Sequence, residues 1–573
     1  MPHYLLSWTD PVDRLFDVTI RFIAPCDRPR LLLPAWRPGR YLIQDYAANV
    51  RDWSPTMEKD GKTSWRVDAN AGDEVEIRYR YYAGVLDAGS SFLDEGEAYF
   101  NGSNLFMLVD GLREEQHRLT IAAPADWRIE TQLPRAEMAD DGWQTAEDND
   151  ESAIRHLPSA ISFLARDYDH LIDSPCIAAA VMTRHTFTEE GARIHLILRD
   201  DEGIDSEPYV EPARRIVRSM SRLFGGLPFR EYRFLYHVGD RWHGVEHEDS
   251  CSIIVKRTAL GDPDEDRFLS ITSHELFHAW NVKRILPARF APYDYWTETP
   301  TRLLWAMEGM TSYYGDLTLR RAGIRDEAAY VEHLRKEIET LENLPGRHAF
   351  SLAQVSFDGW LSDPAHRHDH ANTWFSFYNK GELVSALLDL AIRRATHNEK
   401  SLDDVVRLLW SDYRVLEEDG MERAVAHVAD VGDFFARFVY GTDPLPYELF
   451  ADAGLAFATK PGDPDRAALG AKLRTADGSL LVDSVVRGGA GMSAGLLPGD
   501  ELIAIDGSRV TSSSAVENAM RRVRVGDAAE LIITRAGRVR KLTMTGAPDP
   551  QVTVSLRIAG PSDLRDTWLR ENV

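Results

Sequence analysis

The sequence predicts a multidomain α+β protein, with a β-rich N-terminal domain, a mixed central domain and a small C-terminal domain. A chain of 573 residues is too long for a single hydrophobic core. Residues up to about 165 alternate apolar and polar side chains, as half-buried strands do, whereas helical patterns dominate from 300 to about 440. A segment rich in proline, glycine and aspartate at 459–465 predicts a linker before the last domain.

The composition argues against several functional classes. The 66 basic and 91 acidic residues give a net charge of −25, which opposes binding to nucleic acid or to an anionic membrane surface. No apolar run is long enough to predict a transmembrane helix. Three widely spaced cysteines predict no disulfide framework. The N-terminus lacks a basic segment followed by a long apolar one, so we expect no secretory signal and a cytoplasmic location.

Residues 1–165 are expected to form a β-domain that packs against the central domain. The clearest strand patterns are at 16–22 and 75–81, and the acidic stretch 139–152 is expected to be a loop. This part of the sequence contains no group of residues typical of catalysis.

Residues 166–458 are expected to form the central domain, in which an α/β half precedes a helical half. That order is the one a thermolysin-like fold would have. The elements expected in the α/β half are strands at 192–198 and 232–238, a helix from Pro212 to Gly225, an acidic loop at 244–248, an edge strand at 252–255 and a helix at 267–285.

The helix expected at 267–285 contains the pattern His-Glu-x-x-His. His274 and His278 are four residues apart, so both imidazoles lie on one helix face. Two imidazoles at this spacing can occupy two positions around Zn²⁺. Glu275 is then placed to accept a proton from a water molecule activated by the metal. Because so short a pattern also occurs by chance, the hypothesis needs a third ligand.

Glu308 can supply that ligand. It lies in a helical pattern among Leu304, Met307 and Met310, where a carboxylate is costly unless it binds a cation. The alternative is a solvent-facing glutamate on an amphipathic helix. Gly309, the next residue, would allow a second helix to approach closely. The sequence therefore predicts a His₂Glu site for one Zn²⁺ per chain, with the fourth position open for water, as in catalytic zinc sites.

Two further residues fit a peptidase that removes N-terminal residues. Glu246 precedes the predicted edge strand, and its carboxylate could bind the α-ammonium group of a substrate, although an ordinary acidic loop would have the same composition. Tyr378 could donate a hydrogen bond to a developing oxyanion, although most tyrosines beside helices serve packing.

These motifs resemble the glycyl aminopeptidase family of gluzincin zinc metallopeptidases, whose members carry a C-terminal PDZ domain. The resemblance rests on His274-Glu275-x-x-His278 with Glu308, on Gly-x-Glu-His at 244–247, on Tyr-x-Lys-Gly at 378–381, and on the segments 36–41 and 99–102.

The resemblance implies that Tyr378 stabilises the transition state and that the substrate-binding segment is Gly244, Val245, Glu246 and His247, with Glu246 as the anchor for the amino terminus. It also implies a preference for N-terminal glycine and alanine. The alanyl aminopeptidases, which are similar in their catalytic core, have asparagine where this chain has His247.

Residues 466–548 resemble a PDZ domain of the bacterial-protease kind. Leu469 and Gly470 match its carboxylate-binding loop, 494–500 its central turn and 505–507 the following hairpin. Such domains bind a peptide C-terminus or an extended segment by adding it to a sheet edge, and the alternative is a domain that only packs on its neighbour. Residues 549–573 are expected to form a tail with one more strand. The histidine tract 366–370 is interpreted as an exposed loop rather than a second metal site.

The sequence therefore predicts a zinc-dependent aminopeptidase that acts on peptides with a free N-terminus. Two alternatives stay open: an endopeptidase that receives substrates from the PDZ domain, and a non-catalytic peptide-binding scaffold. A scaffold has no need for the complete set His274, Glu275, His278, Glu308 and Tyr378.

Overall fold

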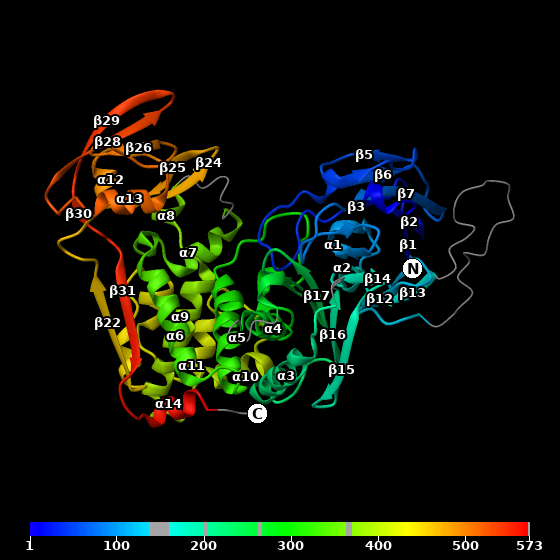
Figure 1. Cartoon of the computed structure of the whole chain (residues 1–573). Coiled ribbons are helices and arrows are strands. Elements are labelled where there is room, and N and C mark those ends of the chain that lie inside the picture. Colours follow the sequence, from blue (N-terminus) through cyan, green and yellow to red (C-terminus); the bar gives the residue numbers. More distant parts are fainter. Residues whose placement is uncertain (137–159, 200–202, 261–265, 362–368, 571–573) are drawn as a thin grey trace.

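The computed structural model describes residues 1–136, 160–199, 203–260, 266–361 and 369–570. Figure 1 shows the N-terminal β-domain and the C-terminal domain at opposite upper ends of the molecule, with the helices of the central domain below and between them. The predicted multidomain α+β fold is confirmed. The acidic stretch 139–152, His366 and His368 lie outside the described residues.

The N-terminal domain is built from three sheets with the strand orders β13-β11-β1-β2-β7-β4, β10-β3-β6-β5 and β12-β14-β9-β8. Its longest pair is antiparallel, β2 (Leu15–Ile23) with β7 (Glu74–Tyr82), and burial alternates along β7 as the sequence pattern predicts. The other strands are β1 (His3–Ser7), β3 (Arg30–Leu32), β4 (Val50–Arg51), β5 (Met57–Lys59), β6 (Ser64–Val67), β8 (Phe92–Leu93), β9 (Glu97–Phe100), β10 (Leu108–Val109), β11 (His117–Ala122), β12 (Arg128–Thr131), β13 (Ala160–Ala165) and β14 (Cys176–Ala179). Short helices α1 (Gly102–Leu105) and α2 (Tyr168–Ile172) accompany them.

The α/β half contains one five-stranded sheet in the order β15-β16-β17-β19-β18, with α3 (Val210–Phe224) and α4 (Arg267–Phe277) packed beside it. Its strands are β15 (Thr183–Glu189), β16 (Ala192–Arg199), β17 (Glu231–Gly239), β18 (His243–Glu246) and β19 (Ser250–Lys256).

Three sequence predictions in this half are wrong. The segment predicted as an edge strand at 252–255 belongs to the inner strand β19, which is buried almost throughout, as its unbroken apolar run implies. The edge is β18, which includes residues expected to form a loop.

Helix α4 ends at Phe277 rather than near 285. The side-chain amide of Asn281 donates to the carbonyls of Ala306 (2.9 Å) and Met307 (3.2 Å), and these bonds hold the chain in a turn after His278.

The helical half surrounds a core shared with α3 and α4. A π-helical turn, Trp305–Gly309, continues into α5 (Met310–Arg321). The remaining elements are α6 (Glu327–Glu342), α7 (Leu352–Phe357), α8 (His370–Thr373), α9 (Phe377–Ala395), α10 (Leu402–Asp412), α11 (Gly420–Val428) and the short paired strands β20 (Leu286–Pro287) and β21 (Val415–Leu416). Among the described helices, none combines the length and the apolar character needed to cross a membrane.

The C-terminal domain is inserted between two paired strands. β22 (Leu455–Pro461) and β31 (Val552–Ile558) run antiparallel, with Leu455 opposite Ile558, and the domain lies between them in sequence. Its main sheet has the order β24-β25-β26-β28-β29, which leaves β24 at an edge. Its elements are β23 (Ala467–Ala468), β24 (Ala471–Ala476), β25 (Ser479–Val485), α12 (Ala490–Ser493), β26 (Glu501–Ile505), β27 (Ser508–Arg509), α13 (Ser513–Met520), β28 (Ala528–Arg535), β29 (Arg538–Thr545) and β30 (Ala547–Pro548).

The chain then returns to the helical half. β31 supplies the strand expected in the tail, and α14 (Asp563–Trp568) follows it. The indole Nε1 of Trp568 donates to the hydroxyl of Tyr313 (2.8 Å), and Arg321 donates to the carbonyl of Trp568 (3.2 Å).

Candidate active site

Helix α4 presents His274, and the residue directly after its end, His278, to a cavity of about 460 Å³. Their Nε2 atoms lie 3.1 Å apart. The hydroxyl of Ser273 donates to the carbonyl of Gly315 (2.8 Å), which ties α4 to α5. A Cβ atom on Gly315 would lie only 3.2 Å from the backbone of His274, so a glycine at this point of α5 lets the two helices approach closely.

Glu308 reaches the same point from the π-helical turn. Its Oε2 lies 3.4 Å from Nε2 of His278 and 3.8 Å from Nε2 of His274. A Cβ atom on Gly309 would lie 2.5 Å from Cα of Gly381, so Gly309 allows α9 to cross here. Single π-helical turns within α-helices are frequent at functional sites. This turn brings the carboxylate of Glu308 to the two imidazoles.

The three side chains fit a Zn²⁺ ion. One ligand atom from each of His274, His278 and Glu308 lies within 4.8 Å of the others. Nδ1 of His278 lies 2.7 Å from the carbonyl of Asn281, so it must donate, and the lone pair of the neutral ring is left on Nε2. That lone pair faces Nε2 of His274 and the carboxylate of Glu308. A cation bound between them would satisfy the two imidazole nitrogens and the carboxylate together. Three protein ligands is also the number found in catalytic zinc sites.

Glu275 lies beside this triad, next to His278. Its side chain is buried, and Oε2 has no hydrogen-bond partner within the described part of the chain. Burial, opposed by His278, raises the pKa of Glu275 to about 8. A Cβ atom on Gly244 would lie 1.9 Å from Oε1 of Glu275, so only glycine fits in β18 at this point. A carboxylate at this position can accept a proton from a water molecule and return it.

Glu246 lies at the end of β18, close to both Glu275 and His278. It is buried, its Oε1 has no hydrogen-bond partner among the described residues, and it approaches Glu275 and His278 closely enough for ligand atoms of the three to lie within 4.8 Å. Gly39 of the N-terminal domain packs against it, because a Cβ atom there would lie 2.3 Å from Oε2 of Glu246. Gly39 and Glu246 both line the cavity, so the N-terminal domain contributes to its wall here.

The other residues of the predicted substrate-binding segment serve different contacts. Val245 is buried against Ala88 and Ile254. His247 turns away to Asp173, with Nδ1 3.1 Å from its carboxylate, and Lys283 binds the same carboxylate at 2.8 Å.

Tyr378, at the start of α9, stacks on His274 with ring centroids 6.2 Å apart. Burial, with Glu308 and Glu246 nearby, raises the pKa of Tyr378 well above its usual value. The phenol therefore stays protonated and able to donate a hydrogen bond.

Sequence reasoning missed Tyr41, whose hydroxyl donates to Oε1 of Glu308 (2.8 Å) from the N-terminal domain. The only signal was the segment 36–41, noted for its resemblance without a role.

The two residues predicted in the PDZ carboxylate-binding loop lie just before β24. The carbonyl of Leu469 accepts from the amide of Gly491 (2.8 Å), and that of Gly470 from the amide of Val486 (2.8 Å). Gly470 has φ +65°, a conformation that favours glycine.

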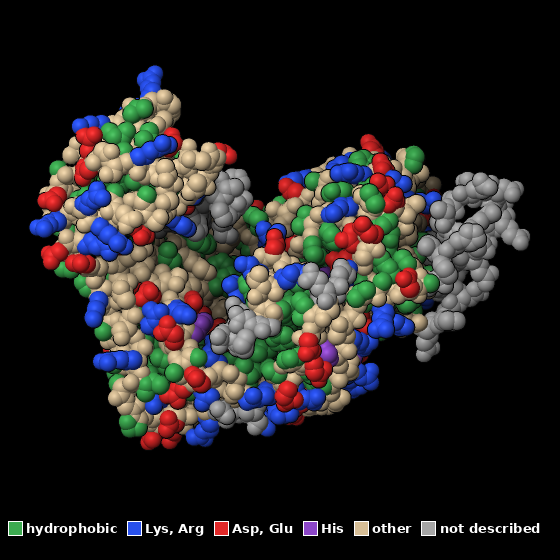
Figure 2. All heavy atoms as spheres, in the orientation of Figure 1, with side chains coloured by type: hydrophobic (Ala, Val, Ile, Leu, Met, Phe, Trp, Pro, Cys, Tyr) green, Lys and Arg blue, Asp and Glu red, His purple; other side chains and the backbone are tan. Residues whose placement is uncertain are grey.

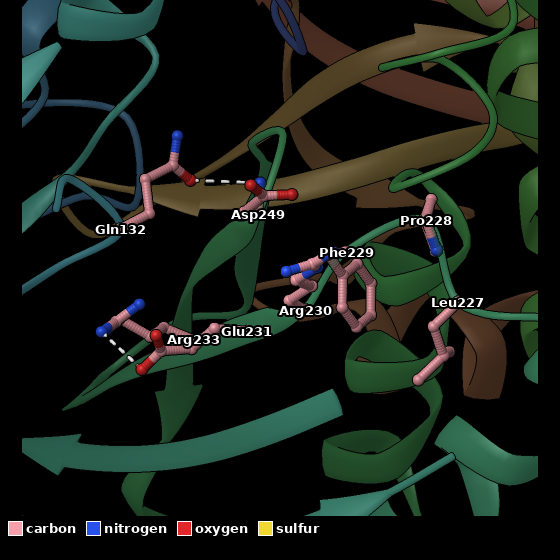
Figure 3. A pocket seen from close by; sticks show the side chains of 8 residues that line it. All are labelled: Gln132, Leu227, Pro228, Phe229, Arg230, Glu231, Arg233 and Asp249. Carbon is pink, nitrogen blue, oxygen red and sulfur yellow. Dashed lines mark hydrogen bonds and ion pairs between the residues drawn. The ribbon is translucent and has the colours of Figure 1, made fainter. Parts of the chain in front are cut away.

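On the face that Figure 2 displays, acidic and basic side chains are interspersed, and a notch separates the C-terminal domain from the N-terminal domain. A second cavity of about 540 Å³ lies where Gln132 meets the start of β17 (Figure 3). Arg233 is paired there with Glu231 (2.8 Å), and Gln132 accepts from the amide of Asp249 (3.2 Å). The eight residues that line it include no histidine or cysteine.

Two models of one peptidase family match the chain. The peptidase M61 N-terminal domain matches residues 3–180, the M61 glycyl aminopeptidase matches residues 267–384, and together they include more than half of the sequence. The chain belongs to the M61 glycyl aminopeptidase family. A PDZ domain model matches residues 467–545, which confirms the PDZ domain expected in this M61 chain. No curated protein matches the chain.

One solved structure is similar to this chain over nearly its whole length, and two others are more distant. A protein of Idiomarina loihiensis described as an aminopeptidase N family protein is 27% identical, with a TM-score of 0.89 over 99% of this chain and 100% of that one. An M1 zinc metallopeptidase from Deinococcus radiodurans is 15% identical (TM-score 0.47, 78% of this chain and 94% of that one). Native yeast LTA4 hydrolase is 14% identical (TM-score 0.45, 79% and 70%). The last two are too distant to support an argument.

Proposed function

We propose that the chain is a zinc-dependent aminopeptidase that hydrolyses the first peptide bond of substrates with a free N-terminus and prefers small first residues, glycine and alanine. The observation that supports this most strongly is Glu246. Its buried carboxylate has an oxygen without a hydrogen-bond partner among the described residues, next to the metal triad and in the wall of the cavity. A substrate ammonium group would satisfy that oxygen, and Gly39 of the N-terminal domain lies directly against Glu246.

His274, His278 and Glu308 would hold Zn²⁺, which when bound acidifies a water molecule and polarises the carbonyl of the scissile bond. Glu275 takes the proton from the attacking water on its carboxylate and then returns it to the leaving amine. The hydroxyl of Tyr378 donates to the carbonyl oxygen as negative charge develops there. Tyr41 holds the carboxylate of Glu308 in place through its hydrogen bond.

The preference for glycine and alanine is the finer part of the proposal. The match of residues 267–384 to the M61 glycyl aminopeptidase supports it.

For the PDZ domain we extend the proposal to a peptide C-terminus or an extended segment that pairs with the free edge of β24, next to Leu469 and Gly470. Titration of a peptide that ends in a carboxylate, against the same peptide ending in an amide, tests this. Equal or absent binding of the two would assign the domain a packing role.

The catalytic proposal is tested with free and N-acetylated dipeptide amides. Gly-X and Ala-X amides should be cleaved, their acetylated forms should not, and chelation should stop the reaction until zinc is restored. Cleavage inside acetylated peptides would indicate an endopeptidase. Zinc binding without cleavage of any peptide would indicate a scaffold.

A further inference from the structure

The cavity continues past the metal triad, in the direction away from Glu246. Glu308, in the π-helical turn that continues into α5, is followed at four-residue spacing by Ser312 and Asp316. On α4, Ser270 precedes His274 by the same spacing, so both helices lead the same way. They meet where the hydroxyl of Ser270 donates to Oδ1 of Asp316 (3.2 Å). The far end of the cavity is therefore built by α4, α5, α6 and α9.

Most charges at this end are compensated within the protein. Nε2 of His333 lies 2.6 Å from the carboxylate of Glu382 and 3.5 Å from that of Asp316. Arg325 binds Oδ1 of Asp316, the oxygen that also accepts from Ser270, at 2.7 Å. Arg267, the one arginine that lines the cavity, lies over the ring of Trp242 at 5.3 Å.

Glu337 is the exception. It lines the cavity from α6, and no lysine, arginine or histidine among the described residues lies within ion-pair distance of it. Its carboxylate accepts one hydrogen bond, from the side-chain amide of Asn379 (2.6 Å). An anion that faces a cavity without a counterion favours a cationic ligand.

Asn379 points to the same kind of ligand. It is 8% exposed and lines the cavity from α9. Its Nδ2 donates to both the carboxylate and the main-chain carbonyl of Glu337 (2.6 and 3.0 Å), which fixes the orientation of the amide. Its Oδ1 is then left without a hydrogen-bond partner among the described residues. A buried acceptor without a partner is costly, and beside a carboxylate it completes a receptor made of acceptors only.

Which part of a substrate would lie next to Glu337 and Asn379 follows from the proposed function, on which the inference rests. With the N-terminus at Glu246 and the scissile bond at the triad, the second residue continues toward the far end. From Glu308 to Asp316, eight residues of helix rise about 12 Å. One extended residue advances about 3.5 Å, and the four-carbon stem of lysine spans most of the rest.

We propose that Glu337 and Asn379 form a subsite for the cationic side chain of the second residue, lysine or arginine. The chain would then remove a small N-terminal residue that stands in front of a basic one. The ammonium or guanidinium group would receive the carboxylate of Glu337 as its counterion and the Oδ1 of Asn379 as a second acceptor.

The test compares Gly-Lys amide with Gly-norleucine amide, which has the same stem length without the charge. The wild-type protein should prefer Gly-Lys by about 10- to 100-fold in kcat/KM, the range for a hydrogen bond to a charged group. Glu337→Gln should reduce that ratio to near unity. Glu332→Gln, a change on the exposed side of the same helix where Glu332 pairs with Arg335, should keep it.

Binding of both peptides to Glu275→Gln protein, with and without Glu337→Gln, measures the subsite without turnover. Equal affinity for the two peptides, or a preference that survives Glu337→Gln, would overturn the inference while leaving the aminopeptidase proposal intact. A binding preference for Gly-Lys that is lost in Glu337→Gln, without cleavage of either peptide by the wild-type protein, would support the subsite and refute the proposed activity.

Discussion

Two clusters of histidine and carboxylate side chains lie in the same cavity, and their surroundings differ. In the triad of His274, His278 and Glu308, two imidazole nitrogens face each other at 3.1 Å. In the cluster of Asp316, His333 and Glu382, one imidazole lies between two carboxylates, and Arg325 binds one of them. Both clusters have the composition of a metal site.

The difference shows that charge balance, more than composition, separates a metal site from a structural ion-pair network. Burial lowers the pKa of His333, but Asp316 and Glu382 outweigh burial and raise that pKa to about 9. Arg325 also supplies Asp316 with a cation from within the protein. No lysine or arginine among the described residues pairs with Glu308, so the nitrogen and oxygen atoms that converge in the triad are left for a metal ion. If catalysis takes place at the triad, substitutions beside it should affect turnover, whereas substitution of His333 should affect mainly stability.

The largest loss is expected for Glu275→Gln. The amide cannot accept a proton, so kcat should fall by about 10²–10⁴, the usual contribution of general acid–base catalysis. The fold and the zinc content should not change, because Glu275 is not a ligand in our assignment. Steady-state kinetics with elemental analysis check both parts. Loss of zinc in this variant would make Glu275 a ligand and would contradict the division of roles.

Glu246→Ala should lower kcat/KM for substrates with a free N-terminus. The loss of transition-state stabilisation should be about 2–5 kcal/mol, the cost of breaking a desolvated charge pair. Glu248→Ala is the matched control, because Glu248 turns away from the cavity to Arg166 and Arg284. Its effect should be much smaller. If both variants lost activity equally, the anchor would not be Glu246.

Tyr378→Phe should lower kcat by roughly 10²–10³, the range for removing one oxyanion donor, with little change in KM. The stacking of the ring on His274 is retained, so the metal should stay bound. A variant with near-normal kcat would assign Tyr378 a packing role.

The smallest effect concerns His333 and stability. Its pKa of about 9 in the folded protein lies above its ordinary value of about 6.5, so folding favours the protonated form. The resulting stabilisation is complete below about pH 6.5 and is lost as pH rises through about 9.

Thermal unfolding of the zinc-loaded wild type and His333→Gln checks this. The wild type should be the more stable at low pH, and the difference in Tm should narrow toward about pH 10. A difference in Tm that does not vary with pH would mean that His333 is neutral in the folded protein. The cluster of Asp316, His333 and Glu382 would then become a candidate metal site.

The sequence was sufficient where the signal is local. The spacing of His274 and His278, and the apolar neighbours of Glu308, predicted residues that the fold brings together. The alternation in β2 and β7 likewise predicted strands. The boundaries drawn at 165, 458, 466 and 548 remain predictions.

Other features depend on contacts between distant segments. Tyr41 reaches Glu308 across 267 residues, and no local pattern signals that bond. The apolar run in β19 could not reveal that β18 pairs outside it. The cluster of Asp316, His333 and Glu382 is assembled from α5, α6 and α9, so its members have no common spacing in the sequence.

One measurement tests the central claim most directly: the zinc content of purified wild type, His274→Ala and His333→Ala after dialysis against zinc-free buffer. The expected result is one zinc ion per chain in the wild type and in His333→Ala, and none in His274→Ala. Two ions in the wild type, retention of zinc in His274→Ala, or its loss in His333→Ala would contradict the assignment of the metal to His274, His278 and Glu308.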